Sequence, residues 1–386
     1  MVLPDYHGCS IVNLMSSIVT GLGGKATGYP PLVCWPRDVL KDVRHLVLIV
    51  MDGLGHDYLL SQGQGTALAR QVRGRLTSVF PSTTAAAITS FYTGLAPQQH
   101  GLTGWHIYFR ELGGVLAVLP GVPRYGGASL KKSGIPVQRF FDHRPVFDRI
   151  PVKCQVVSPA RIAHSDFNLA HRGKASIMAY DTLEAFFTTL ERIAKQPGGR
   201  SFTYAYWPEF DHICHESGSQ SEAALAHLQA FDRVYQHFLA AIDNTPTRVL
   251  VTADHGFVDT CPERTLNLAD HPEVSESLIL PLCGEPRVAY CYVKPRHTAR
   301  FEAYVRTHLG TCLELRDSQE LLAEGYFGAG KPHPRLADRI GDYTLVMEDN
   351  WIVKDRLPFE KDHQQIGVHG GVDPAEMYVP LCVAGG

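Results

Sequence analysis

The sequence lacks several features that would assign it to a specialised class of proteins. It contains no run of like charges, and 36 Lys and Arg against 39 Asp and Glu give a formal net charge of −3. We therefore expect neither a nucleic-acid coat nor a polybasic membrane anchor. The most apolar stretch, His45 to Met51, is too short to cross a bilayer. The N-terminus has no basic segment followed by an apolar core, so we expect a cytoplasmic location and no membrane association.

Closely spaced cysteine pairs are also missing. The nine cysteines are an odd number without a C-x-x-C pair, which argues against a disulfide framework and predicts reduced, mostly buried thiols. With 35 Gly and 25 Pro the chain is not of low complexity, and it shows no repeat of fixed period. We predict one continuous domain over residues 1–386.

Apolar residues are abundant, and their pattern predicts an α/β fold. At 45% hydrophobic and 10% aromatic, the chain can bury a large core. Three short apolar runs predict strands, and the first and third are rich in branched residues without alternation, as is typical of strands buried on both faces of a parallel sheet. These runs are residues 45–51, 201–207 and 248–253, and each is followed by an acid, namely Asp52, Asp211 and Asp254.

Helical periodicity lies between these runs. Residues 219–241 carry apolar side chains at steps of three and four, and Ser219 with Glu222 fits a capping box. Alternating strands and helices predict an α/β fold with a doubly wound, mostly parallel central sheet and helices on both faces. Residues 261–331 break this rhythm, and we interpret them as a smaller inserted cap lobe.

Ligands bind at the carboxyl ends of the strands in such sheets, so all three acids should lie on the functional edge. The chain is also rich in histidine, with 19 in all. Short motifs at distant positions offer carboxylates, imidazoles and a hydroxyl, a donor set that suits two divalent transition ions. The candidate metal ligands are Asp52, Thr84, Asp211, His215, Asp254, His255 and His369.

Two cations about 4 Å apart can hold the attacking and leaving oxygens of an in-line phosphoryl displacement. Thr84 is placed for the nucleophilic role, since the following residues predict a helix that Gly94 can end. Ser82, Thr83 and Thr84 are all able to cap this helix, so Thr84 could be a helix cap only. In that case one of its two neighbours could be the nucleophile.

The order of these motifs resembles that of the alkaline phosphatase superfamily, and within it the type I phosphodiesterase and nucleotide pyrophosphatase family. Residues 81–84 (Pro-Ser-Thr-Thr), 93–97 (Thr-Gly-Leu-Ala-Pro) and 100–101 (His-Gly) match that family's nucleophile helix. The resemblance extends from about Leu46 to the C-terminus.

This resemblance implies a hydrolase of phosphate esters, with small phosphodiesters or nucleotide pyrophosphates as substrates, that acts through a covalent phospho-Thr84. It implies two divalent metal ions. We expect zinc, and manganese and iron are the alternatives. One would be held by Asp211, His215 and His369, and the other by Asp52, Thr84, Asp254 and His255.

One position departs from the family pattern. Family diesterases carry an Asn twenty-one residues after the nucleophilic Thr, where this chain has Trp105. His106, Tyr108 or a backbone N–H could then contact the phosphoryl oxygens, and Trp105, His106 and Tyr108 are the candidate substrate-binding residues. The departure leaves a phosphomonoesterase or a phosphonate hydrolase open. A phosphomutase and a catalytically silent binding protein on the same fold are disfavoured.

Overall fold

A seven-stranded sheet forms the centre of the molecule in the computed structural model, which describes residues 1–33, 37–40, 42–141, 143–358, 360 and 364–385. Its order is β2-β18-β9-β1-β8-β6-β7. The five strands from β9 to β7 run parallel to one another, and β18 pairs antiparallel with both β2 and β9. The strands are β1 (His45–Met51), β2 (Val72–Thr77), β6 (Lys153–Pro159), β7 (Ser176–Tyr180), β8 (Ser201–Trp207), β9 (Thr247–Thr252) and β18 (Tyr378–Ala384). The predicted mostly parallel sheet is confirmed.

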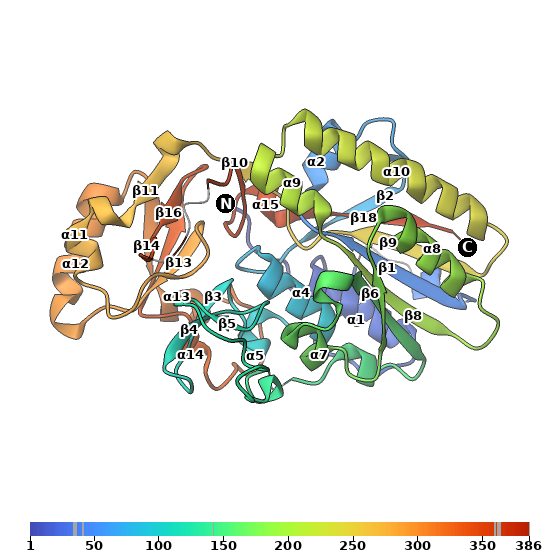
Figure 1. Ribbon diagram of the computed structural model, residues 1–386, viewed down its shortest axis with the longest axis horizontal. Helices are drawn as coiled ribbons and strands as arrows, with labels where there is room; N and C mark the ends of the chain where they lie inside the picture. The colour runs from blue at the N-terminus through green and yellow to red at the C-terminus, as the bar shows by residue number, and fades with distance from the viewer. Residues whose placement is uncertain (34–36, 41, 142, 359, 361–363, 386) are drawn as a thin grey trace.

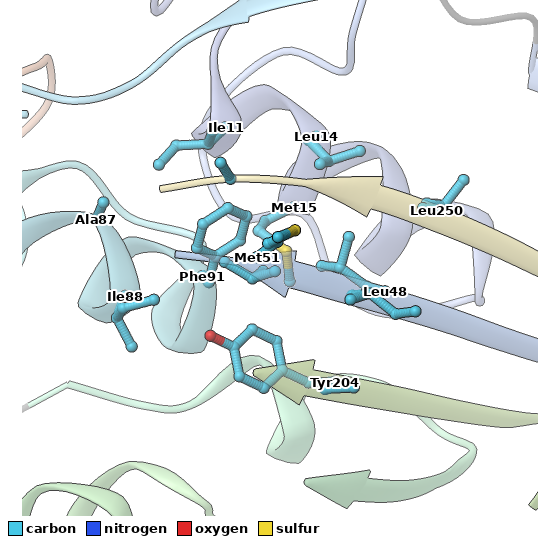
Figure 2. Close-up of a cluster of buried hydrophobic side chains, with 14 of the residues drawn as sticks. Ile11, Leu14, Met15, Leu48, Met51, Ala87, Ile88, Phe91, Tyr204 and Leu250 are labelled. Atoms are coloured by element: carbon cyan, nitrogen blue, oxygen red, sulfur yellow. The ribbon is translucent and has the colours of Figure 1, made fainter. Parts of the chain in front are cut away.

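Helices cover both faces of this sheet. Figure 1 shows α8 (Leu183–Ala194) and α10 (Glu222–Ile242) on one face, and α1 (Ile11–Gly21) and α4 (Thr84–Thr93) on the other. Figure 2 shows how the second layer forms, with apolar side chains of α1 and α4 against the strands. Leu48, Tyr204 and Leu250 occupy one register position on three adjacent strands and are buried there. The α/β layers therefore share one large hydrophobic core.

The start of α10 differs from the sequence prediction. The helix begins at Glu222, and its N-cap is Ser221, whose side chain accepts a hydrogen bond from the Ala224 N–H. The predicted capping box of Ser219 with Glu222 is therefore wrong. The backbone N–H groups of Ser219 and Gln220 instead donate to the Asp259 carboxylate, at 2.7 and 3.2 Å, so these residues belong to a preceding turn.

A second seven-stranded sheet stands beside the first (Figure 1) and has the order β14-β15-β13-β12-β3-β4-β5. Its strands are β3 (His106–Phe109), β4 (Gly114–Ala117), β5 (Val122–Pro123), β12 (Cys283–Gly284), β13 (Val288–Cys291), β14 (Leu313–Asp317) and β15 (Tyr343–Met347). All of its pairings are antiparallel. Some of these strands lie inside the segment 261–331 and others outside it, and the boundaries of an inserted lobe stay a prediction.

Two small sheets and several short helices connect these layers. The small sheets pair β10 (Val258–Asp259) with β17 (Gly367–Val368), and β11 (Thr265–Asn267) with β16 (Ile352–Lys354). The other α-helices are α2 (His56–Ser61), α3 (Ala67–Arg70), α5 (Pro97–His100), α6 (Ala160–Ala163), α7 (Asp166–His171), α9 (Glu209–Ser217), α11 (Pro272–Ser275), α12 (Thr298–Tyr304), α13 (Ser318–Ala323), α14 (Leu336–Arg339) and α15 (Pro374–Met377).

The structure also shows the state of the cysteines and the lengths of the helices. The eight cysteines that the structure describes form no disulfide with one another, and five of them are buried; Cys34 lies outside the described residues. Among the residues described, no helix has both the length and the apolarity that a bilayer crossing requires.

Candidate active site

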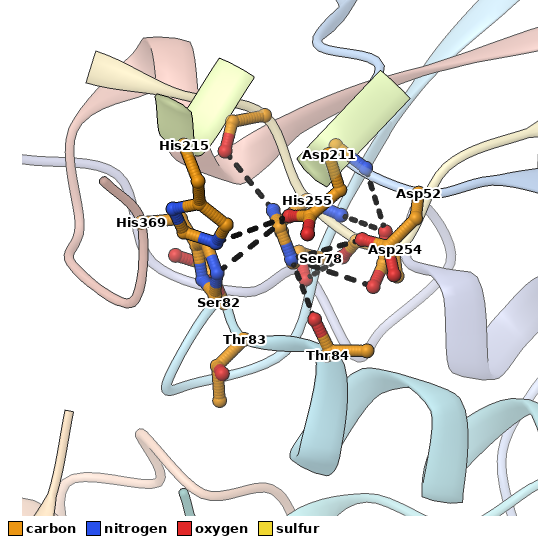
Figure 3. Close-up of polar contacts among 12 residues, drawn as sticks. Asp52, Ser78, Ser82, Thr83, Thr84, Asp211, His215, Asp254, His255 and His369 are labelled. Atoms are coloured by element: carbon orange, nitrogen blue, oxygen red, sulfur yellow. Dashed lines mark hydrogen bonds and ion pairs between the residues drawn. The ribbon is translucent and has the colours of Figure 1, made fainter. Parts of the chain in front are cut away.

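Three carboxylates meet at the carboxyl edge of the central sheet. Asp52 directly follows β1, Asp254 lies two residues beyond the end of β9, and Asp211 lies in α9 just after β8. Because β9, β1 and β8 are adjacent and parallel, their carboxyl ends share one edge. Figure 3 shows the three side chains converging there, as the sequence predicts.

Close backbone packing at this edge requires Gly53. Its φ is +78°, a conformation that side chains with a Cβ disfavour. A Cβ at this position would lie 2.4 Å from the Phe257 ring and 3.3 Å from the Asp211 Cα. The glycine therefore lets the loop after β1 approach α9, and its N–H donates to Asp254 Oδ1 at 3.1 Å.

Histidines surround the carboxylates. His215 lies one helical turn after Asp211 on the same face of α9, and its Nε2 is 3.4 Å from Asp211 Oδ1. His369 Nε2 lies 3.9 Å from the same oxygen. The rings of His255 and His369 are stacked, with centroids 3.7 Å apart. The fold therefore brings together side chains from distant parts of the sequence.

The His255 ring occupies the centre of the cluster, as Figure 3 shows. Its Nε2 is 3.3 Å from Asp52 Oδ1, 3.4 Å from Asp254 Oδ2 and 3.1 Å from Thr84 Oγ1. All seven predicted ligands thus face one another. Two groups have ligand atoms within 4.8 Å of one another, namely Asp211 with His255 and His369, and Asp52 with Asp254 and His255.

Thr84 is the first residue of α4, and Thr83 is the N-cap. The helix ends at Thr93, and Gly94 follows as its C-cap in the left-handed conformation, with φ +67°. The prediction that Gly94 ends this helix is confirmed. The Thr84 hydroxyl points toward His255, whereas the Thr83 hydroxyl donates to Glu285 Oε1 at 2.5 Å, and that of Ser82 donates to the Gly371 carbonyl oxygen. Of the three hydroxyls considered from sequence, only that of Thr84 contacts the candidate ligands.

Unsatisfied carboxylate oxygens show that the site suits metal ions. Asp52 Oδ1, Asp211 Oδ1 and Asp254 Oδ2 are buried, and none of them has a hydrogen-bond partner among the residues that the structure describes. A buried carboxylate oxygen without a donor is unfavourable unless a cation satisfies it. The other oxygens of two of these groups are held in place: Asp254 Oδ1 accepts the Gly53 and His255 N–H groups, and Asp52 Oδ2 accepts the Tyr206 hydroxyl proton.

The imidazoles are oriented in the way that metal ligands usually are. Each can donate its Nδ1–H to a backbone carbonyl oxygen: His215 to Gly367 at 2.8 Å, His255 to Gly256 at 3.1 Å, and His369 to Ser82 at 3.3 Å. This fixes the ring and leaves the Nε2 lone pair directed into the cluster, as metal binding requires.

Burial shifts the protonation equilibria of the cluster. Desolvation, and then the neighbouring Asp254 and Asp211 carboxylates, raise the pKa of Asp52 well above its usual range. Desolvation also raises the pKa of Asp254. The pKa of His369 is lowered well below its usual value by burial and by the nearby His255 and His215 rings. Divalent cations would offset the crowding of the carboxylates, and they bind the neutral form of the imidazole.

A cavity of about 780 Å³ opens onto this cluster. Thr84, Asp211, His215 and His369 line one part of it. Of the predicted substrate-binding residues, Trp105 and His106 line the cavity. Tyr108 packs edge-on against the Tyr292 ring, with centroids 5.4 Å apart, and is not among the lining residues.

Sequence reasoning missed three polar groups next to the site. Glu285 lines the cavity beside Thr83. Arg124 lines it further out and pairs with Glu360, Nε to Oε1, at 2.7 Å. Arg287 and Glu376 form a buried ion pair behind the His369 loop. Each contact joins segments distant in sequence, and no local motif marks them.

A doubly wound α/β sheet with Asp, His and Thr side chains gathered at its carboxyl edge defines the class of the molecule as the alkaline phosphatase superfamily. The family model described as type I phosphodiesterase / nucleotide pyrophosphatase matches residues 46–372. The chain therefore belongs to this family of metal-dependent hydrolytic enzymes.

Solved structures with this fold share little sequence with the chain. The structure of human ectonucleotide pyrophosphatase / phosphodiesterase 5 has a TM-score of 0.65 at 17% identity, and covers 88% of this chain and 87% of that one. An inactive form of the murine protein, in complex with AMP, has a TM-score of 0.64 at the same identity and coverage. Phosphonoacetate hydrolase from Sinorhizobium meliloti 1021, with phosphonoformate, has a TM-score of 0.64 at 16% identity, covering 88% and 90%. A search of curated proteins found no match.

Proposed function

We propose that the protein hydrolyses small phosphodiesters or nucleotide pyrophosphates through a covalent phospho-Thr84 intermediate. The observation that carries this proposal is the position of Thr84 Oγ1, 3.1 Å from His255 Nε2 and beside three carboxylates. Each of these carboxylates has one buried oxygen without a hydrogen-bond partner in the part of the chain that the structure describes. A hydroxyl at a helix N-terminus, beside candidate metal ligands, is suited to nucleophilic attack.

Two divalent ions, zinc in our proposal, would supply Lewis-acid stabilisation of the phosphoryl oxygens and lower the pKa of a bound hydroxyl. In the proposed assignment, Asp211, His215 and His369 hold one ion, and Asp52, Thr84, Asp254 and His255 hold the other. A ring nitrogen of His255 lies within 4.8 Å of ligand atoms of Asp211 and His369, and also within 4.8 Å of ligand atoms of Asp52 and Asp254. Carbonyl contacts at Nδ1 keep each ring in its ligand orientation.

The reaction would take two displacements. In the first, the Thr84 oxygen gives up its proton to solvent and bonds to phosphorus, while the bond to the leaving oxygen breaks and the leaving group departs with the bonding electron pair. In the second, water attacks phosphorus and gives up a proton, the bond between phosphorus and the Thr84 oxygen breaks, and this oxygen takes up a proton to restore the hydroxyl. The cavity beside Thr84 has room for a nucleotide-sized leaving group, and Trp105 and His106, both partly exposed, line it.

Phosphonate hydrolysis is the second candidate. The fold is as close to that of a phosphonoacetate hydrolase as to that of the nucleotide pyrophosphatases, with TM-scores of 0.64 in both cases. Such a reaction would use the same Thr84 and the same ligands but break a carbon–phosphorus bond.

A cytoplasmic location also remains a prediction.

The test compares wild type, Thr84→Ala and Thr84→Ser on bis-p-nitrophenyl phosphate, p-nitrophenyl phosphate, a nucleotide p-nitrophenyl ester and phosphonoacetate, with metal analysis of each sample. We expect two metal equivalents and preference for the diesters in wild type. Thr84→Ala should lose about 10³-fold or more in kcat with metal content nearly unchanged, and Thr84→Ser should retain part of the activity. Wild-type rates in Thr84→Ala would remove Thr84 from the mechanism, and release of phosphate from phosphonoacetate alone would favour the second candidate.

A further inference from the structure

Glu285 reaches from the second sheet to the nucleophile. It directly follows β12, and it is 8% exposed. Its Oε1 accepts two hydrogen bonds, from the Thr83 hydroxyl at 2.5 Å and from the Trp105 N–H at 2.6 Å. One donor precedes Thr84, and the other is the residue that stands where family diesterases carry an Asn. The carboxyl group therefore lies next to the place where that amide would be.

The second oxygen of Glu285 is available to a ligand. Among the described residues, Oε2 makes no hydrogen bond, whereas Oε1 takes both donors. Glu285 lines the cavity together with Thr84 and Trp105. A phosphoryl group attacked by Thr84 would thus have a carboxylate oxygen close to its non-bridging oxygens, where an Asn would present N–H donors.

We propose that Glu285 is a specificity-determining residue that disfavours dianionic phosphoryl groups and so directs the site toward monoanionic phosphodiesters. The inference rests on the proposed function. An ionised carboxylate only accepts hydrogen bonds, and it repels each further negative charge on the ligand. A phosphodiester carries one charge and offers ester substituents toward this side, so it is repelled less than a phosphomonoester or inorganic phosphate.

The charge of Glu285 depends on burial. Desolvation raises its pKa to about 7, although the hydrogen bonds from Thr83 and Trp105 oppose the shift. The Asp211 carboxylate raises the pKa further. Measurements at about pH 8.5 therefore compare an ionised Glu285 with its variants.

Glu285→Gln separates charge from structure. The Gln carbonyl oxygen can still accept the Thr83 and Trp105 protons, while its amide N–H₂ faces the cavity as a donor. Glu191→Gln is the control for the loss of one negative charge, because Glu191 lies on α8, pairs with Lys195 at 2.6 Å and is not among the residues that line the cavity.

The test measures binding of inorganic phosphate and of dimethyl phosphate to the metal-loaded proteins by isothermal titration calorimetry, and the ratio of kcat/KM for the p-nitrophenyl diester and monoester. We expect Glu285→Gln to tighten phosphate binding by about 10-fold or more, to change dimethyl phosphate binding much less, and to shift the kcat/KM ratio toward the monoester. Glu191→Gln should leave both comparisons near wild type.

Three outcomes would overturn the role of Glu285: equal changes for the two ligands in Glu285→Gln, the same change in Glu191→Gln, or no phosphate binding in wild type and Glu285→Gln alike. Absence of ester hydrolysis in wild type would refute the proposed function only, since phosphate binding still decides the role of Glu285.

Discussion

Replacing Arg287 with Met should destabilise the protein strongly, because it leaves a carboxylate buried without its cation. The side chains of Arg287 and Glu376 are 1% and 0% exposed, and Nη2 lies 2.7 Å from Oε2. Glu376 Oε1 also accepts the Gly371 N–H at 2.8 Å, and Arg287 Nη1 donates to the Trp351 carbonyl oxygen at 2.7 Å. The pair thus joins the second sheet to the loop that carries His369.

The magnitude follows from this burial. Removing one partner of a buried ion pair costs about 3–5 kcal/mol, since the remaining charge is desolvated and unpaired. The double variant Arg287→Met/Glu376→Leu removes both charges and leaves the Gly371 and Trp351 groups without these partners, each worth about 1 kcal/mol. We therefore expect the double variant to lose only about 2 kcal/mol, less than either single variant.

Urea unfolding followed by tryptophan fluorescence, in the presence of a chelator, measures these free energies of unfolding without a contribution from metal. An unfolding free energy for Arg287→Met within about 1 kcal/mol of wild type would refute the reasoning. So would a double variant that loses the sum of the two single losses, because the two charges would then be independent.

Two further predictions concern hydrogen bonding and pH. Tyr206→Phe removes the hydroxyl that donates to Asp52 and should weaken binding of one metal equivalent by about 10–100-fold, as measured by chelator competition; unchanged affinity for both equivalents would contradict it. Burial lowers the pKa of His171 from 6.5 to about 4, so as pH falls below about 6.5 the unfolded chain binds a proton before the folded one, and up to about 3 kcal/mol of stability should be lost by pH 4. His171→Gln should show a flatter loss of stability in urea titrations between these pH values, and an equally steep loss would exclude His171 as its source.

Local sequence was sufficient to predict the strands that carry the site. β1 and β8 have the predicted bounds because their apolar runs are buried and end at polar residues. The start of α10 could not be predicted in the same way, since Asp259, about forty residues downstream, binds the N–H groups that precede the helix. Distant partners can override a local capping pattern.

The candidate ligands could be predicted because a family motif places them, whereas the residues that support them could not. Glu285 contacts Thr83 across 202 positions, and Arg287 contacts Glu376 across 89. A buried carboxylate or guanidinium has no sequence signal of its own, because ordinary surface residues are of the same types. The packing of the second sheet against the start of α4 brings Glu285 to Thr83, and its packing against α15 brings Arg287 to Glu376.

The register of the central sheet explains how two carboxylates that we assign to the same ion come together. β1 and β9 are parallel and paired from His45 with Thr247 to Val50 with Thr252. Continued for two residues beyond the last pair, this register places Asp52 opposite Asp254, at one strand spacing of about 4.8 Å. Both acids lie just beyond the ends of their strands, and the Gly53 N–H, which donates to Asp254 Oδ1 at 3.1 Å, joins the two segments there. The pairing of β1 with β9 and this hydrogen bond therefore set the two acids side by side.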